Sequence, residues 1–162
     1  MKRGPELGYS GRYRLFEPVV AEAFDLAYTA RIAAGRYWSS FTDDQRRLYL
    51  KTYTDWTVAT YAGRFRSHSG EQFTHPAQRP AARGSVTVTT TLAPTDRGKI
   101  DFAYQLRKSD GRWRIVDIRI EGISQLALTR SQFVTVLRKR GFPQLIATLN
   151  EKIANLARGK EG

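Results

Sequence analysis

FAYQLRKSDGRWRIVDIRIEGISQLALTRSQF, residues 102–133, is the segment that constrains the fold most strongly. Apolar and polar residues alternate before and after Asp110-Gly111, a dipeptide typical of two-residue β-hairpin turns. A helical pattern begins almost where the second alternating stretch ends. The segment therefore predicts two antiparallel strands followed directly by a helix. It contains no recognisable set of catalytic groups, and its apolar and aromatic face is more typical of a carrier of apolar molecules than of an enzyme.

The second of these strands changes its alternation part of the way along. Trp113 and Ile115 have one parity, whereas Ile118 has the other. If the turn has two residues, one extra residue near positions 116–117 places Ile118 opposite Tyr104 in the ladder. We therefore predict a β-bulge at this point of the strand.

The N-terminal part of the chain is expected to be irregular at first and then helical. Residues 1–15 are rich in Gly, Arg and Tyr, and we expect residues 1–10 to be irregular. Pro18 fits the first turn of a helix, where its missing N–H has no cost. A second, short helix is expected over residues 26–34, ended by Gly35.

The clearest helix is predicted for residues 43–66. Thr42 and Gln45 have the spacing of a capping box at its start. Tyr53 and Trp56 belong to an aromatic stripe at helical spacing. Core packing is the simpler explanation of this stripe, and a wall against a bound ligand is the alternative.

The remaining segments complete an α+β pattern. An alternating strand is expected over residues 86–92, a turn over 94–98, and helices over 124–140 and from Pro143 onwards. Helices therefore precede and follow an antiparallel sheet, which predicts helices gathered on one face of a curved sheet. We expect one domain over residues 1–162. A helix layer over such a sheet encloses a space, which becomes a long apolar cavity if side chains do not fill it.

Charge and composition limit the classes of partner. The chain of 162 residues has 27 Lys and Arg against 15 Asp and Glu, a net charge of +12, and no cysteine. It should therefore be attracted to nucleic acid, to an anionic membrane surface or to an acidic protein, and it can hold no disulfide. Met1 to Arg3 are followed by Gly4-Pro5 rather than by an apolar core, so we expect either an intracellular protein or one whose leader has been removed.

Candidate chemistry is sparse. His68 and His75 fall in a polar region and offer no ligand spacing for a metal. Asp101 and Asp117 lie on neighbouring predicted strands, so a small enzyme that uses Asp117 is one alternative, provided that the bulge turns this carboxylate inward. A basic nucleic-acid-binding module is another, although the basic residues are scattered and the densest cluster, residues 138–140, is short.

Five short motifs follow one another in the second half of the chain: Phe102 to Arg107, Asp110 to Trp113, Val116 to Ile118, Glu121 to Ser124 and Arg130 to Phe133. In this order they resemble the MlaC family, the periplasmic lipid-binding proteins of the toluene-tolerance type. The resemblance extends from about Leu7 to Ala157. Within the family, the segments Ser67 to Glu71 and Ile123 to Ala127 are similar to the hopanoid-associated branch, HpnM.

The resemblance implies a soluble shuttle that carries phospholipid or hopanoid between the inner and outer membranes. Lipid tails would lie between sheet and helices, with the head group near the mouth of the cavity. No cofactor, metal or nucleic acid is expected. The implied partners are an inner-membrane transporter, outer-membrane lipid-transport components and anionic membrane surfaces. Because relatives begin with a signal peptide, the resemblance implies a periplasmic location after its removal.

We expect apolar side chains of both layers to line the lipid site. Those expected from the helices are Phe16, Val20, Phe24, Trp38, Tyr53, Trp56, Leu137 and Leu149; those expected from the sheet are Val86, Val88, Phe102, Tyr104, Leu106, Ile118 and Ile120. At the mouth, Arg107 and Arg130 are the candidates for contact with a phosphate, because a guanidinium can donate two parallel hydrogen bonds to it.

Overall fold

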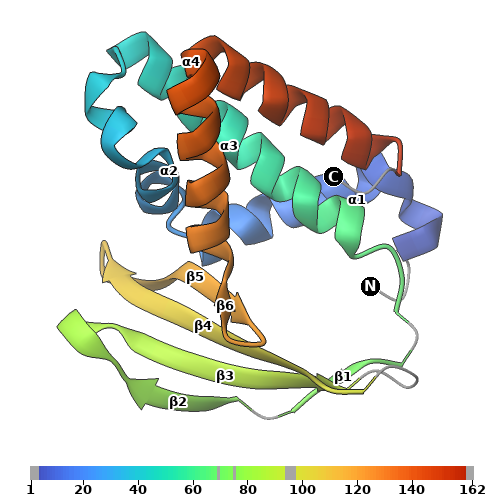
Figure 1. Ribbon diagram of the computed structural model, residues 1–162. Helices are drawn as coiled ribbons and strands as arrows, with labels where there is room; N and C mark the ends of the chain where they lie inside the picture. Colours follow the sequence, from blue (N-terminus) through green and yellow to red (C-terminus); the bar gives the residue numbers. More distant parts are fainter. Residues whose placement is uncertain (1–3, 69, 75, 94–97, 160–162) are drawn as a thin grey trace.

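The computed structural model describes residues 4–68, 70–74, 76–93 and 98–159. The α-helices are α1 (Gly4–Ala23), α2 (Leu26–Ala34), α3 (Asp43–Arg64) and α4 (Gln125–Ala157), and a 3₁₀ helix, η1 (Gly35–Ser40), follows α2. Figure 1 shows that the helices form one layer above a curved sheet. The predicted α+β class is therefore confirmed. Most of the predicted turn 94–98 lies outside the described residues, as does His75.

Within the described residues, the sheet is antiparallel and has six strands. Its strands are β1 (Gln72–Phe73), β2 (Ala77–Pro80), β3 (Val86–Ala93), β4 (Ile100–Ser109), β5 (Arg112–Ile120) and β6 (Ile123–Ser124). They lie in the order β1-β3-β4-β5-β6, and β2 also pairs with β3. A short 3₁₀ turn, η2 (Ala82–Gly84), connects β2 to β3. The three long strands β3, β4 and β5 thus form the body of the sheet.

The predicted hairpin and bulge are both confirmed. Asp110 and Gly111 have positive φ angles of 48° and 77°. The two-residue β-hairpin turn that matches the twist of the strands requires positive φ at both of its central residues. Leu106 pairs with Ile115, and Gln105 then pairs with Asp117, so one residue is extra on β5. The bulge returns the apolar residues of the second half of β5 to the face that they would otherwise leave.

A second tight hairpin follows β5 and was not predicted from the sequence. Glu121 and Gly122 have φ angles of 49° and 79°, and Ile120 pairs with Ile123 of β6. Ser124 then caps α4 by accepting a hydrogen bond from the backbone N–H of Ala127 at 3.0 Å. The chain therefore turns at 121–122 into one more short strand before α4 begins.

The predicted irregular start of the chain is wrong from Gly4 on, because α1 begins there, and residues 1–3 lie outside the described residues. Pro18, predicted for the first turn of a helix, lies instead in the interior of α1. A kink at Gly8, where φ is 58°, divides the helix. The buried Arg12 holds this region in place by donating to the carbonyl oxygens of Ala62 at 2.8 Å and of Gly4 at 3.0 Å. One hydrogen bond to α3 and one back to Gly4 thus order a segment whose composition alone favours irregular structure.

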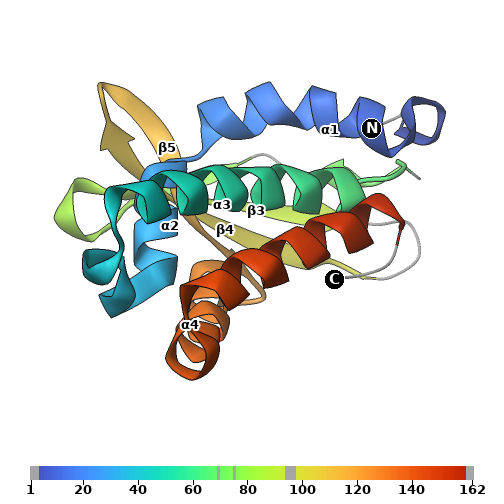
Figure 2. The ribbon, with the colours of Figure 1, turned by 90° about the horizontal axis from the view of Figure 1, so that it is seen from above.

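The other helices follow the sequence pattern. Thr42 and Gln45 make both hydrogen bonds of the capping box at the start of α3. Helix α2 covers residues 26–34 as predicted. The predicted break between the last two helices is a kink inside α4 at Gly141, where φ is 76°. Figure 2 shows α1, α3 and the second half of α4 running beside one another over the strands.

The closely packed core lies within the helix layer. Tyr49, Phe133, Leu145 and Leu149 are at most 2% exposed and belong to one cluster built by α2, α3, α4 and Phe41. Edge-to-face ring contacts, such as Phe41 to Phe142 at 4.9 Å, add to this packing. The helices therefore stabilise one another largely without the sheet.

The sheet is attached to the helices mainly along β5. Val116, at the bulge, is the one buried apolar strand residue in the part of the chain that the structure describes. The backbone N–H of Asp25 donates to the carbonyl oxygen of Ile115 at 3.0 Å, beside a bridge from Phe24 to Ile115. Strand β4 approaches α2 through the Arg107 side chain, whose Nε lies 3.8 Å from Asp25, the N-cap of that helix.

Candidate functional site

One face of the sheet carries a continuous set of apolar side chains that are only half-buried. We call it the inner face, and it consists of Val86, Val88, Phe102, Tyr104, Leu106, Ile118 and Ile120. Strand register places these residues opposite one another, for example Val88 against Tyr104 and Tyr104 against Ile118. Water therefore reaches an apolar surface that a filled core would cover.

An aromatic group on the helices lies opposite. We call Phe16, Phe24, Tyr61 and Phe65 the aromatic wall. Tyr61 is its centre, with ring centroids 5.9 Å from Phe16, 5.6 Å from Phe24 and 5.7 Å from Phe65. Burial raises the pKa of Tyr61, and Tyr104 of the inner face adds to this increase. Part of the aromatic wall therefore lies near Tyr104 of the inner face.

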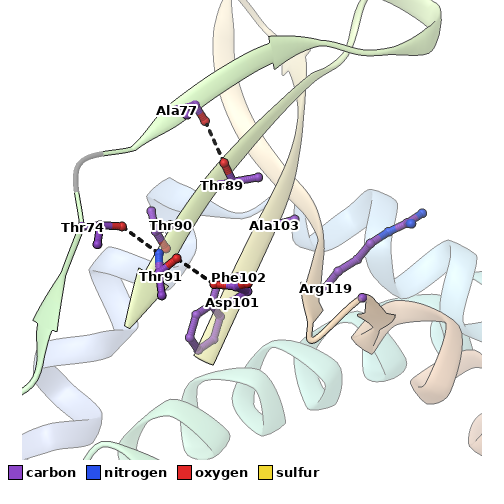
Figure 3. A pocket seen from close by; sticks show the side chains of 10 residues that line it. Thr74, Ala77, Thr89, Thr90, Thr91, Asp101, Phe102, Ala103 and Arg119 are labelled. Atoms are coloured by element: carbon purple, nitrogen blue, oxygen red, sulfur yellow. Dashed lines mark hydrogen bonds between the residues drawn. The ribbon is translucent and has the colours of Figure 1, made fainter. Parts of the chain in front are cut away.

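The other side of the sheet is polar. A hollow of about 370 Å³ lies there, lined chiefly by Thr89, Thr91, Asp101, Ala103 and Arg119. Figure 3 shows that Arg119 leaves the sheet away from the side on which the Phe102 ring lies. The lining groups already bind one another, since the Thr91 hydroxyl donates to Asp101 at 2.7 Å. This hollow is unsuited to hydrocarbon chains.

The structure divides the predicted lipid-site residues into two sets. All seven sheet residues lie together on the inner face, and Phe16 and Phe24 lie in the aromatic wall. Val20, Tyr53, Leu137 and Leu149 are buried inside the helix layer, at 2%, 6%, 6% and 0% exposure. Trp38 and Trp56 pack against that core and remain half-buried.

The two arginines predicted for the mouth are not brought into one site. Arg107 lies at the start of α2, with its Nε 3.8 Å from Asp25 and its guanidinium 4.4 Å from the centre of the Tyr28 ring. Arg130 lies beside Gly35, at the other end of α2. The two side chains thus flank opposite ends of one short helix.

Asp117 has a structural partner for each carboxylate oxygen. Its Oδ1 accepts a hydrogen bond from the backbone N–H of Leu126 at 3.0 Å, and its Oδ2 is 3.9 Å from Arg119. The carboxylate therefore satisfies the N-terminus of α4, where a negative charge is favourable. These contacts give Asp117 a structural role that involves no catalysis.

The described residues contain no group of three or more His, Cys, Asp or Glu side chains that could hold a metal ion. His68 has its Nδ1 3.1 Å from Glu71 in the segment before β1. Across the same described ranges, no helix is both long and apolar enough to cross a membrane.

Two residues of this site, Phe65 and Tyr61, were not predicted from the sequence, and Tyr61 is the central one. It lies eight positions after Tyr53, so two steps of four along the same helix connect the two tyrosines. Extending the aromatic stripe of α3 by these steps would have found it. Phe65, four residues further on, stacks on Tyr61 with an angle of 9° between the rings.

Comparison with known proteins gives a consistent result. A family model described as "MlaC protein" matches residues 2–151. The chain is 22% identical over 134 residues to the intermembrane phospholipid transport system binding protein MlaC of Haemophilus influenzae. The aligned part makes up 78% of this chain and 61% of that relative, so the chain spans less than two thirds of the relative's length.

A solved structure is similar over almost the whole chain. It is the phospholipid-binding protein from Ralstonia solanacearum in complex with a phospholipid, which superposes with a TM-score of 0.82 at 26% sequence identity. The match covers 95% of this chain and 87% of that one. Since the family model also covers most of the residues, this protein belongs to the MlaC family.

Proposed function

We propose that this protein binds a phospholipid, with its acyl chains between the inner face and the aromatic wall, and carries it between membranes. The observation that supports this most is that every residue of the inner face is only half-buried. The helices above it have a packed core of their own, so they do not need the inner face to complete it. An apolar surface of this kind gains free energy when hydrocarbon covers it. The lipid bound by the Ralstonia relative is consistent with the same use here.

The energetics explain why such a carrier is needed. A free diacyl lipid in water exposes about thirty methylenes, each costing roughly 0.8 kcal/mol, so leaving a bilayer unaided costs on the order of 20 kcal/mol. A protein that replaces most of that burial with its own apolar walls removes most of the barrier. The inner face and the aromatic wall supply those walls in this proposal.

The head group would remain at the edge of the site, in contact with water. Arg107 or Arg130, at opposite ends of α2, is the proposed contact for its phosphate. Arg107 already pairs with Asp25, so a phosphate would compete with that carboxylate. The net charge of +12 would assist approach to anionic membranes or acidic partners.

The route of transport is part of the same proposal. The name of the Haemophilus relative refers to an intermembrane phospholipid transport system, which supports a path between two membranes. The family resemblance implies that these are the inner and outer membranes. The partners would then be transport components at each membrane, and the compartment would be the periplasm. Phospholipid is the proposed cargo, and hopanoid is the alternative from the HpnM resemblance.

Native mass spectrometry of the purified protein, with organic extraction of what it holds, tests this function. We expect a bound mass that corresponds to a phospholipid and that disappears after extraction. A bound hopanoid instead would change the identity of the cargo but would still support the carrier function. Protein without any lipid, which also takes none up from vesicles, would contradict the function.

High salt provides a second test. Tail binding is apolar, whereas docking on anionic surfaces is electrostatic and is screened by salt. Salt should therefore slow delivery to vesicles and leave the lipid on the isolated protein. If the isolated protein lost its lipid in high salt, apolar contacts with the tails would not be what holds the lipid.

A further inference from the structure

We propose that the end of the β4–β5 hairpin is the element by which this protein docks on an anionic lipid surface. The hairpin end comprises Lys108 to Trp113 and lies at the margin of the molecule (Figure 1). The proposal rests on the proposed function in one respect, which is that a lipid carrier must meet a bilayer or its lipids. It goes further by assigning a place on the molecule to that encounter.

The hairpin end combines an exposed tryptophan with exposed cations. Trp113 is 48% exposed, whereas the two other tryptophans, Trp38 and Trp56, are half-buried against the core. Strand register places it directly opposite Lys108, and Arg112 precedes it. Lys108 and Arg112 are both exposed. Tryptophan rings prefer the head-group level of a bilayer, where lysine and arginine meet lipid phosphates.

The hairpin is held firmly against the helices. Arg114 donates from its Nη1 to the carbonyl oxygens of Ala21 at 3.2 Å and Phe24 at 3.4 Å. Arg107, its cross-strand neighbour, pairs with Asp25. These two arginines are engaged in anchoring the hairpin, so Lys108 and Arg112 are the cations presented at its end.

The β-bulge connects the hairpin end to the proposed lipid site. Trp113 and Ile115 share a face of β5 before the bulge, and Ile115 pairs with Leu106 of the inner face. The extra residue at Val116 returns Ile118 to that same face. An uninterrupted apolar row therefore runs from the exposed tryptophan into the site. Without the bulge, the row would change faces in the middle of the strand.

The shape and charge of this end favour a lipid surface over a protein partner. A protein interface centres on a well-packed core that excludes water, whereas this end is a narrow, convex turn with one large apolar side chain. Its exposed charged groups are Lys108, Arg112 and the single anion Asp110. Such a combination is suited to shallow insertion among anionic head groups.

Vesicle flotation with the lipid-loaded, full-length chain tests the proposal. The probe is a vesicle of equal parts phosphatidylcholine and phosphatidylglycerol, compared with phosphatidylcholine alone. Trp113→Ala and the double variant Lys108→Glu with Arg112→Glu should each bind the anionic vesicles at least about tenfold more weakly than wild type. Brominated lipids should quench wild-type fluorescence more strongly than that of Trp113→Phe.

Two matched variants control for general effects. Ile123→Ala removes an apolar side chain that is 56% exposed in β6, and Arg138→Glu with Lys139→Glu reverses two exposed charges on α4. Both should bind vesicles as wild type does. All these sites are on the surface, so equal thermal midpoints should show that each variant is folded.

The proposal is overturned if the hairpin variants bind as wild type does, as they would if this end meets an acidic protein instead. Equal binding to neutral and anionic vesicles would overturn it too. Lipid content, measured by extraction in the same samples, separates this proposal from the carrier function. If the protein holds lipid but the hairpin variants bind vesicles as wild type does, only the docking site is contradicted. If the protein holds no lipid but its vesicle binding still requires the hairpin end, only the carrier function is contradicted.

Discussion

The helix layer and the inner face of the sheet are rich in the same kinds of apolar side chain, yet they are buried to different extents. Leu149 and Tyr49 of the helices are 0% exposed. Leu106 and Tyr104 of the inner face are only half-buried. Residue type therefore does not distinguish a structural core from a binding surface in this molecule. The distinction lies in whether a second layer of protein covers the side chain.

The difference follows from how the layers are joined. The helices pack against one another, and the sheet meets them mainly along β5, through Val116, Asp117 and Ile115. The long strands β3 and β4 are left with an apolar face that helix side chains do not fully cover. A protein can keep such a face stably only if its free energy of folding comes from elsewhere, which the helix core provides.

The largest effect on stability is expected for Leu149→Ala. This side chain is fully enclosed by the helix core, so its truncation leaves a cavity and should lower the free energy of unfolding by about 2–5 kcal/mol. Urea denaturation followed by circular dichroism would measure the change. A loss below about 1 kcal/mol would mean that the helix layer is not the packed core.

A smaller effect is expected for Asp117→Ala, which removes the acceptor for the Leu126 N–H at the joint between β5 and α4. Loss of a charged acceptor at a helix N-terminus should cost roughly 1–3 kcal/mol. Asp101→Ala, on the polar side of the sheet, is the matched control and should cost less. If a folded Asp117→Ala protein still delivers lipid, Asp117 has a structural role. If the variant has wild-type stability and delivers no lipid, the structural role is contradicted and the enzyme alternative regains support.

Alkaline pH should weaken the helix core selectively. Burial raises the pKa of Tyr53 to about 12 from its usual 10.0 and also raises that of Tyr49. Since the folded state prefers the neutral phenol, this contribution to stability is complete below pH 10.0 and is lost as the pH rises through about 12. The unfolding free energy of Tyr53→Phe should fall less steeply over this range than that of wild type. If the unfolding free energies of wild type and Tyr53→Phe fell equally steeply with pH, burial of the neutral Tyr53 phenol would not contribute to the stability of the core.

The smallest effect on stability is expected for Leu106→Ala, the counterpart of Leu149→Ala on the inner face. Because Leu106 is already partly exposed, its truncation should cost no more than about 1 kcal/mol in lipid-free protein. Added phospholipid should stabilise wild type more than this variant, as a shift in the thermal midpoint would show. A cost as large as that of Leu149→Ala would mean that the inner face is part of a filled core.

Local signals in the sequence were sufficient for most of the sheet and for α3. The Asp110-Gly111 turn and the parity change at Ile115 determine the hairpin and the bulge, because register depends on neighbouring residues alone. The capping box at Thr42 determines the start of α3 in the same way. All three features were predicted from patterns of only a few residues.

Features that depend on distant contacts could not be predicted. Helix α1 is stabilised by Arg12, which reaches the carbonyl oxygen of Ala62 fifty positions away. Likewise, helical spacing predicts that Tyr53 faces inward, but it cannot decide whether another helix or a ligand lies there. The division of the predicted lipid-site residues between core and inner face required the packed structure.

Photocrosslinking tests the central claim most directly. The protein would be loaded with a phospholipid that carries a photoactivatable group in its acyl chain, irradiated and mapped by peptide mass spectrometry. We predict adducts on the inner face, at residues such as Tyr104, Leu106 and Ile118, and on Tyr61 of the aromatic wall. Adducts confined to the polar side of the sheet, around Thr89 and Arg119, or spread over the outer surface of the helices would contradict the account.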